Sequence, residues 1–202
     1  FYLMTSGRVD FASNIVEIGC GCGRRTHLIS NYNFHGEAYT GKYLGIDIDG
    51  EMLEWCRAHF DPERFEFVQS THASAAYKGQ EQGSRYRIPR EDATQDLVFG
   101  TSVLTHLLEE QLREYFEEAA RILKPGRTMA MTAKCIDLGA RSVGNTYRHR
   151  IGPAYVENPE VPEAAVAYES EFLLEQARAA GFSDARVLHD DSDWQHTLVA
   201  VK

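Results

Sequence analysis

The sequence is short of positive charge and has no long apolar run. Among its 202 residues, 21 lysines and arginines stand against 30 aspartates and glutamates, for a formal net charge of -9. Nucleic-acid binding through phosphate neutralisation needs a basic face, so we expect no nucleic-acid partner. No apolar run approaches the length that spans a bilayer, and no signal-peptide pattern opens the chain. We therefore expect no membrane span and a cytoplasmic location.

Cysteine is scarce, and its spacing lacks a metal-site pattern. Cys20 and Cys22 are one residue apart, whereas Cys56 and Cys135 are distant in the sequence. Structural zinc sites present two C-x₂₋₄-C pairs, or one such pair with histidines at fixed offsets, and neither pattern occurs here. We interpret the four cysteines as small buried thiols of a protein in a reducing compartment.

A glycine-rich segment is the most informative feature that the sequence does have. A short apolar run contains Glu17, and Gly19, Gly21 and Gly23 follow at alternate positions. The dinucleotide-binding pattern G-x-G-x-x-G is absent, because its third glycine position holds Arg24. A strand, a glycine loop and a helix in this order form the nucleotide pocket of an open α/β sheet.

Strand-like and helix-like segments alternate along the rest of the chain, which favours parallel βαβ units. The expected strands are 14–18, 43–48, 65–69, 96–101, 128–133, 185–188 and 195–201. The expected helices are 24–30, 50–60, 107–123 and 171–180. The segments 72–95 and 137–168 lack a clean pattern, and a loop as long as the second is usually functional in a compact domain.

The glycine spacing Glu-x-Gly-x-Gly-x-Gly resembles motif I of the class I S-adenosylmethionine-dependent methyltransferases. Residues 99–107 resemble motif IV of that family, and the Leu-Lys-Pro-Gly of residues 123–126 is similar as well. The resemblance covers about residues 14–134. It implies a Rossmann-like α/β fold, with a seven-stranded sheet whose last strand is antiparallel and helices on both faces. We expect a single domain over 1–202, with a substrate-side insertion at about 137–168.

The resemblance also implies S-adenosylmethionine as the cofactor. The loop and the following helix N-terminus would favour its carboxylate, and Glu17 would bind its ammonium group. Asp47 closes the second strand, where a carboxylate suits two ribose hydroxyls, and Asp49 is expected to cap the next helix. The expected cofactor-binding residues are Glu17, Gly19, Gly21, Gly23, Arg24, Asp47, Ile48, Met52, Thr71, Thr101 and Ser102.

The chain departs from the family pattern after the third strand. Family members usually have an aspartate there, which binds the adenine amino group. This sequence offers Gln69, Ser70 or Thr71 as a substitute. The departure concerns adenine recognition and leaves the expected cofactor unchanged.

His106 and His149 are the candidate general bases. Both lie where a base would be useful for methylating a weakly acidic hydroxyl, whereas a neutral amine needs little help. Two other roles stay open: His106 orients the cofactor or caps the next helix, and His149 is a solvated loop histidine. No carboxylate stands at residues 100–102, where metal-dependent O-methyltransferases hold magnesium, so we predict no catalytic metal.

The segment 137–168 supplies the expected acceptor side of the site. Tyr147, Arg148 and Tyr155 are predicted to line it. The basic residues around Arg148 are either a clamp for an anionic acceptor or a solvated loop with ordinary ion pairs. Residues 147–149 and 162–168 also resemble small bacterial methyltransferases that accompany sugar-modifying enzymes.

Together these features predict O-methylation of a small-molecule or sugar/glycan acceptor. Three alternatives remain at this point: an N-methyltransferase of the same fold, a non-catalytic partner subunit that keeps the cofactor pocket, and an NAD-dependent enzyme. The glycine spacing speaks against the last of these and does not distinguish acceptor atoms.

Overall fold

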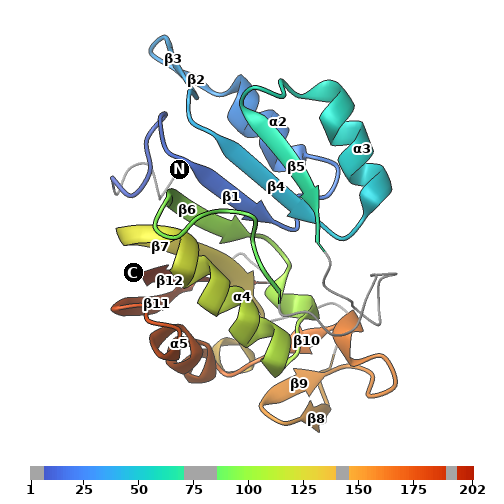
Figure 1. Ribbon diagram of the computed structural model, residues 1–202. Coiled ribbons are helices and arrows are strands. Elements are labelled where there is room, and N and C mark those ends of the chain that lie inside the picture. The colour runs from blue at the N-terminus through green and yellow to red at the C-terminus, as the bar shows by residue number, and fades with distance from the viewer. Residues whose placement is uncertain (1–6, 71–85, 140–145, 190–194) are drawn as a thin grey trace.

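The computed structural model describes residues 7–70, 86–139, 146–189 and 195–202, and a seven-stranded sheet forms its centre (Figure 1). The strand order is β11-β12-β7-β6-β1-β4-β5. These strands are β1 (Ile15–Ile18), β4 (Tyr43–Asp47), β5 (Phe65–Gln69), β6 (Gln95–Gly100), β7 (Leu123–Ala133), β11 (Asp184–Leu188) and β12 (His196–Val201). Two small sheets are formed by β2 (Asn33–Phe34) with β3 (Glu37–Ala38), and by β8 (His149–Ile151), β9 (Ala154–Val156) and β10 (Val166–Ala167).

The strand directions confirm the predicted fold. β1 pairs in parallel with β4 and β6, and the parallel pairing continues outward to β5 and β7. β12 is antiparallel to both of its neighbours, β7 and β11. Six strands of this sheet therefore run one way and the last strand of the chain runs the other. All four residues of β1 are buried, as expected of a parallel strand that is covered on both faces.

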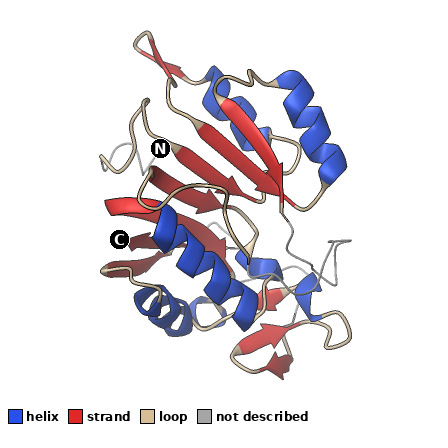
Figure 2. Cartoon of the chain, in the orientation of Figure 1, coloured by secondary structure: helices blue, strands red, loops and turns tan. Residues whose placement is uncertain are grey.

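Helices cover both faces of the sheet (Figure 2). They are α2 (Arg24–Asn31), α3 (Gly50–His59), α4 (Glu109–Ile122) and α5 (Ser170–Ala179), with the short 3₁₀ helices η1 (Leu104–His106), η2 (Ile136–Leu138) and η3 (Pro162–Ala164). Successive strand residues point to opposite faces. Val16 and Ile18 of β1 accordingly join the core cluster of α4 and α5, and Ile15 joins a second cluster with Leu53 and Cys56 of α3.

Two of the differences from the sequence-based expectation concern the segment 137–168 and the start of β7. The segment 137–168, which shows no regular pattern, contains η3 and an antiparallel sheet in the order β10-β9-β8. Strands of two or three residues are too short for the alternation of apolar and polar side chains to be visible in a sequence. β7 begins at Leu123 instead of Thr128, and its pairing with β6 is irregular near that start.

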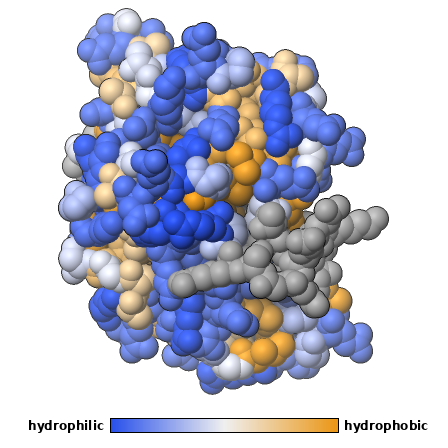
Figure 3. Space-filling view, in the orientation of Figure 1, coloured by the Kyte–Doolittle hydropathy of each residue, from blue (hydrophilic) through white to orange (hydrophobic). Residues whose placement is uncertain are grey.

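The visible face of the molecule is largely hydrophilic (Figure 3). Hydrophobic side chains gather in the upper half of this view, over β4 and β5, with hydrophilic side chains around them. Within the described part of the chain, no helix has both the length and the apolar character needed to cross a membrane.

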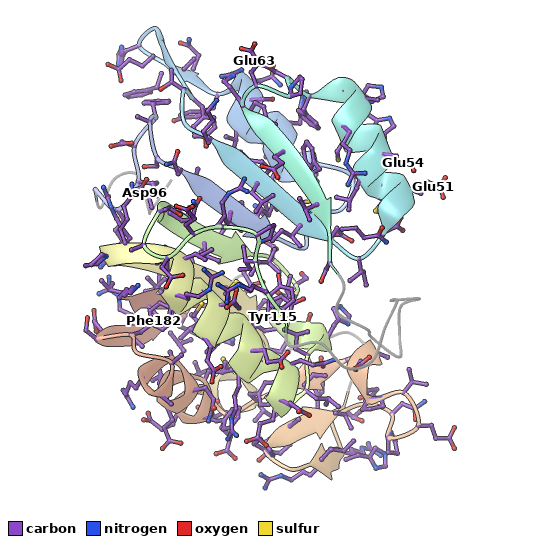
Figure 4. The ribbon with its side chains drawn as sticks, in the orientation of Figure 1. Glu51, Glu54, Glu63, Asp96, Tyr115 and Phe182 are labelled. Atoms are coloured by element: carbon purple, nitrogen blue, oxygen red, sulfur yellow. The ribbon has the colours of Figure 1, made fainter. Side chains whose placement is uncertain are left out.

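A buried carboxylate joins three strands at the amino ends of the parallel strands, which is the edge of the sheet away from the carboxyl ends. Asp96 of β6 is 4% exposed and accepts a hydrogen bond from the backbone N–H of Asn14 at 3.0 Å (Figure 4). Lys124 Nζ lies 2.9 Å from both of its oxygens, and Arg127 Nε lies 3.1 Å from one of them. These contacts tie the starts of β1 and β7 to β6.

We predict that Asp96→Asn lowers the free energy of unfolding by about 1–3 kcal/mol, since hydrogen bonds to a buried charge are lost. The matched control is Asp92→Asn, because Asp92 is exposed and bonds to Arg121. The midpoint of urea denaturation should change little for that variant. Equal shifts for the two variants would contradict the role assigned to Asp96.

Candidate functional site

A cleft of about 360 Å³ lies at the carboxyl ends of β1, β4 and β6. It lies where the strand order reverses, because β4 pairs on one side of β1 and β6 pairs on the other. Open α/β sheets bind ligands at this switch point, and the volume falls in the range of small-molecule sites. The lining residues are Ile18, Gly19, Ile46, Asp47, Ile48, Asp49, Met52, Ser70, Thr101, Ser102, Val103, His106, Leu107 and Tyr115.

Two glycines of the loop after β1 occupy positions that no other residue fits. Gly19 has a φ of +73°, and a Cβ atom there would lie 2.6 Å from Cγ2 of Val103. Gly23 has a φ of +77° and precedes α2, and its Cβ would lie 2.7 Å from Cε2 of Phe60. Glycine thus supplies both the left-handed backbone and the space for close packing.

Asp47 connects the loop after β1 to the end of β4. Its Oδ2 accepts the N–H of Gly21 at 2.7 Å, and its Oδ1 accepts the N–H of Asp49 at 3.0 Å. A carboxylate has about four lone-pair sites, so each oxygen keeps capacity for a ligand in the cleft. Asp49 accepts the N–H of Met52 at 3.1 Å, which confirms the predicted helix cap.

Glu17 is buried beneath the loop and is not among the lining residues. Its carboxylate accepts a hydrogen bond from the hydroxyl of Tyr43, which in turn accepts one from Thr26 Oγ1 at 2.9 Å. Burial raises the pKa of Glu17 to about 7, although the Tyr43 hydroxyl acts in the opposite direction. The role of Glu17 toward an ammonium group stays a prediction.

Of the three candidate adenine partners, Ser70 is the one found among the described lining residues of the cleft. Gln69 turns its side-chain amide to the carbonyl of Ile48 at 2.9 Å, and Thr71 lies outside the described residues. Ser70 is buried in the lining and hydrogen bonds with Tyr115 of α4. Burial raises the pKa of Tyr115 to about 12, so its hydroxyl stays protonated at neutral pH. Sequence reasoning missed Tyr115, whose only signal was a hydroxyl within the apolar stripe of a helix.

His106 lines the cleft with a defined orientation. Its Nδ1 lies 2.9 Å from the backbone carbonyl oxygen of Glu163. A carbonyl oxygen only accepts hydrogen bonds, so Nδ1 carries the proton and the neutral ring has its lone pair on Nε2. The buried Glu163 side chain accepts from Gln111 at 3.0 Å, and Gln111 accepts the N–H of Leu108 at 3.0 Å. Residues of η3 and α4 thereby fix the tautomer of a histidine in η1.

The remaining predicted site residues lie outside the lining that the structure describes. Gly21, Gly23 and Arg24 belong to the loop and to the first residue of α2. His149 is exposed on β8, and Arg148, just before that strand, is also exposed. Their roles as base, cofactor ligands or acceptor ligands stay predictions.

The two predicted acceptor-side tyrosines have well-defined surroundings. Tyr147 is buried with a φ of +47°, and its N–H donates to the carboxylate of Glu157 at 2.9 Å. This bond and a second from the neighbouring backbone N–H hold the pKa of Glu157 below its usual value. Tyr155 donates to Glu169 at 2.6 Å, and the guanidinium of Arg150 lies 4.7 Å from the centre of its ring.

The described ranges contain no group of three or more His, Cys, Asp or Glu side chains arranged to hold a metal ion. Cys20, Cys56 and Cys135 are buried free thiols, and Cys22 is exposed. Burial raises the pKa of Cys56 to about 11, so this thiol is protonated at neutral pH.

We predict a pH-dependent stability difference between the wild-type protein and Glu17→Gln. The folded pKa of Glu17 is about 7 and its ordinary value is 4.5, so between these values the folded state holds a proton that the unfolded state releases. The wild type should therefore lose up to about 3 kcal/mol, relative to Glu17→Gln, as the pH rises through this window. Urea denaturation at pH 5 and pH 8 measures the difference, with Glu54→Gln on the exposed side of α3 as control. A gap that stays constant with pH would refute the assignment.

Comparison with known proteins agrees with this geometry. A family model described as "Methyltransferase domain" matches residues 16–131, which is more than half of the chain. The chain is 31% identical over 124 residues to the malonyl-[acyl-carrier protein] O-methyltransferase of Hahella chejuensis (strain KCTC 2396). That match covers 61% of the chain but only 37% of the relative, so the chain spans little more than a third of its length.

Solved structures show the same fold. A SAM-dependent methyltransferase from Methanosarcina mazei superposes with a TM-score of 0.65 at 18% identity, covering 100% of this chain and 98% of that one. Human N-acetylserotonin methyltransferase in complex with SAM superposes with a TM-score of 0.60 at 17% identity, covering 97% and 50%. The family match shows that the chain belongs to the methyltransferase domain family, and the solved structures show that it shares their fold.

Proposed function

We propose that the cleft holds S-adenosylmethionine and that the protein methylates an oxygen atom of a small-molecule or sugar/glycan acceptor. The residues of the cleft fit the cofactor. Gly19 and Asp47 both line the cleft, and Asp47 offers carboxylate oxygens to a ribose. Ser70 offers a hydroxyl on the lining, in place of the usual aspartate. S-adenosylmethionine, when bound, supplies an electrophilic methyl group.

The orientation of His106 carries the proposal of oxygen as the acceptor atom. The basic Nε2 belongs to a residue of the lining, while Nδ1–H is committed to the carbonyl of Glu163. A neutral hydroxyl is a poor nucleophile, and it is too weak an acid to lose its proton unaided. Nε2 of His106 can accept that proton as the methyl group is transferred. The Glu163 carbonyl then keeps its bond to Nδ1–H and holds the charged ring in place. An amine acceptor would need no such base.

The similarity to an O-methyltransferase supports the same acceptor atom. His149 and the basic residues beside it add a weaker argument for an anionic or glycan acceptor, because they lie exposed on and beside the small sheet β8-β9-β10. β10 lies against η1, the element that carries His106. The insertion therefore adjoins the element that carries the proposed base.

We predict that Asp47→Ala weakens the binding of S-adenosylhomocysteine roughly 10- to 100-fold, because two charge-assisted hydrogen bonds are lost. Isothermal titration calorimetry measures the dissociation constant. Asp47→Asn keeps one acceptor oxygen and should fall between Asp47→Ala and the wild type. Unchanged affinity in Asp47→Ala would show that the nucleoside does not lie against β4.

We further predict that His106→Asn lowers kcat for a hydroxyl acceptor by roughly 100-fold or more, the usual contribution of a general base. Asparagine can keep a donor near the Nδ1 position and lacks Nε2, so the affinity for S-adenosylhomocysteine should stay within about twofold. A screen of sugars, carboxylates, phenols and amines with radiolabelled methyl donor supplies the acceptor.

The matched variant for this test is His149→Asn, which removes the other candidate base. A large loss of kcat in His149→Asn alone would transfer the role to that histidine. Methylation of amines only, with His106→Asn fully active, would overturn the O-methyltransferase proposal.

A further inference from the structure

Ser102 has a backbone conformation that non-glycine residues rarely adopt. It lies between the end of β6 and the start of η1, lines the cleft and has a φ of +60°. A serine is strained in this left-handed region unless its surroundings hold it there, and such residues concentrate at functional sites.

Three hydrogen bonds in a closed ring hold this conformation. The N–H of Ser102 donates to Thr132 Oγ1 at 2.7 Å, and the Thr132 hydroxyl donates to Gln195 Oε1 at 2.5 Å. The amide of Gln195 returns to Ser102, donating from Nε2 to Oγ at 2.9 Å. The directions are mutually consistent, because each hydroxyl accepts one bond and only the Thr132 hydroxyl must donate within the ring. The hydroxyl hydrogen of Ser102 is not used in this ring.

The ring acts on a turn that forms one wall of the cleft. The carbonyl of Ser102 is also engaged, since it accepts a bond from the buried Thr105 hydroxyl at 2.9 Å. The next residue, Val103, is the one that a Cβ on Gly19 would meet at 2.6 Å. The conformation of Ser102 thus sets how the turn 101–103 packs against the glycine loop.

We propose that Thr132 and Gln195 are positioning residues for the cofactor end of the cleft. They hold the strained Ser102, and through it the turn 101–103, in the shape that receives S-adenosylmethionine. Gln195 immediately precedes β12 and is 93 positions away from Ser102 in sequence. Neither positioning residue belongs to the lining, and both lie beyond the matched family segment 16–131. The inference rests on the proposed assignment of the cleft as the cofactor site.

A double-mutant cycle separates positioning from a general structural role. Calorimetry with S-adenosylhomocysteine measures the dissociation constants of the wild type, Gln195→Ala, Ser102→Gly and the double variant. Gln195→Ala should weaken binding roughly 3- to 10-fold, the effect of losing one or two neutral hydrogen bonds. Glycine at position 102 has no Oγ and adopts this φ without strain, so Gln195→Ala should have almost no effect in that background.

Position 132 provides a second, conservative comparison. Thr132→Val removes the hydroxyl and should weaken binding by a similar factor, whereas Thr132→Ser keeps Oγ and should restore nearly wild-type affinity. Thermal unfolding of each variant confirms that the compared proteins are folded. A purely structural tie would lower the melting temperature of Thr132→Val without changing the affinity of the folded protein.

The outcomes are distinguishable. Unchanged affinity in Gln195→Ala, or an equal loss with and without Ser102→Gly, would overturn the positioning role while leaving the cleft as the cofactor site. Failure of the wild-type protein to bind S-adenosylhomocysteine would contradict the proposed function, and this inference with it. Loss of affinity that appears only when Ser102 is present would support the inference.

Discussion

The close approach of two backbone turns governs the architecture of the site. The glycine loop after β1 and the turn after β6 meet where Gly19 lies against Val103, with no room for a Cβ between them. Both sides of this contact use left-handed backbone, at Gly19 and at Ser102. Parallel strands bring their carboxyl ends to one edge of the sheet. The two turns meet at that edge, and residues of both turns line the cleft.

The chemistry of the cleft draws on elements that are remote in sequence. Asp47 secures the loop after β1 from the end of β4, and the ring through Gln195 secures the turn after β6 from the start of β12. The orientation of His106 depends on a carbonyl in η3, within the segment 137–168. The parallel sheet therefore positions the proposed cofactor side of the cleft, whereas the insertion orients the proposed base.

The two ends of the sheet differ in how a buried carboxylate is accommodated. At the amino ends of the strands, Asp96 is buried and neutralised by Lys124 and Arg127. Near the site, burial raises the pKa of Glu17 in spite of the hydrogen bond from the Tyr43 hydroxyl, so the ionised form of Glu17 destabilises the fold. The ion pairs of Asp96 thus stabilise the end of the sheet away from the cleft. The buried carboxylate of Glu17, which lowers the stability of the fold when ionised, lies next to the glycine loop.

Local patterns were enough to predict the parallel βαβ units, the four helices, the glycine loop and the Asp49 cap, because each depends on neighbouring residues and on strand burial. The reversed direction of the last strand was expected from the family resemblance and not from these patterns. The same patterns did not reveal the sheet β8-β9-β10, whose strands are too short to show a period. They also left Gln69, Ser70 and Thr71 as possible adenine partners, of which Thr71 was placed in the expected cofactor-binding set. Packing distinguished the first two, because Gln69 turns to the Ile48 carbonyl while Ser70 is buried beside Tyr115. The tautomer of His106 and the ring around Ser102 arise from contacts between residues distant in the chain, so only the folded structure could decide them.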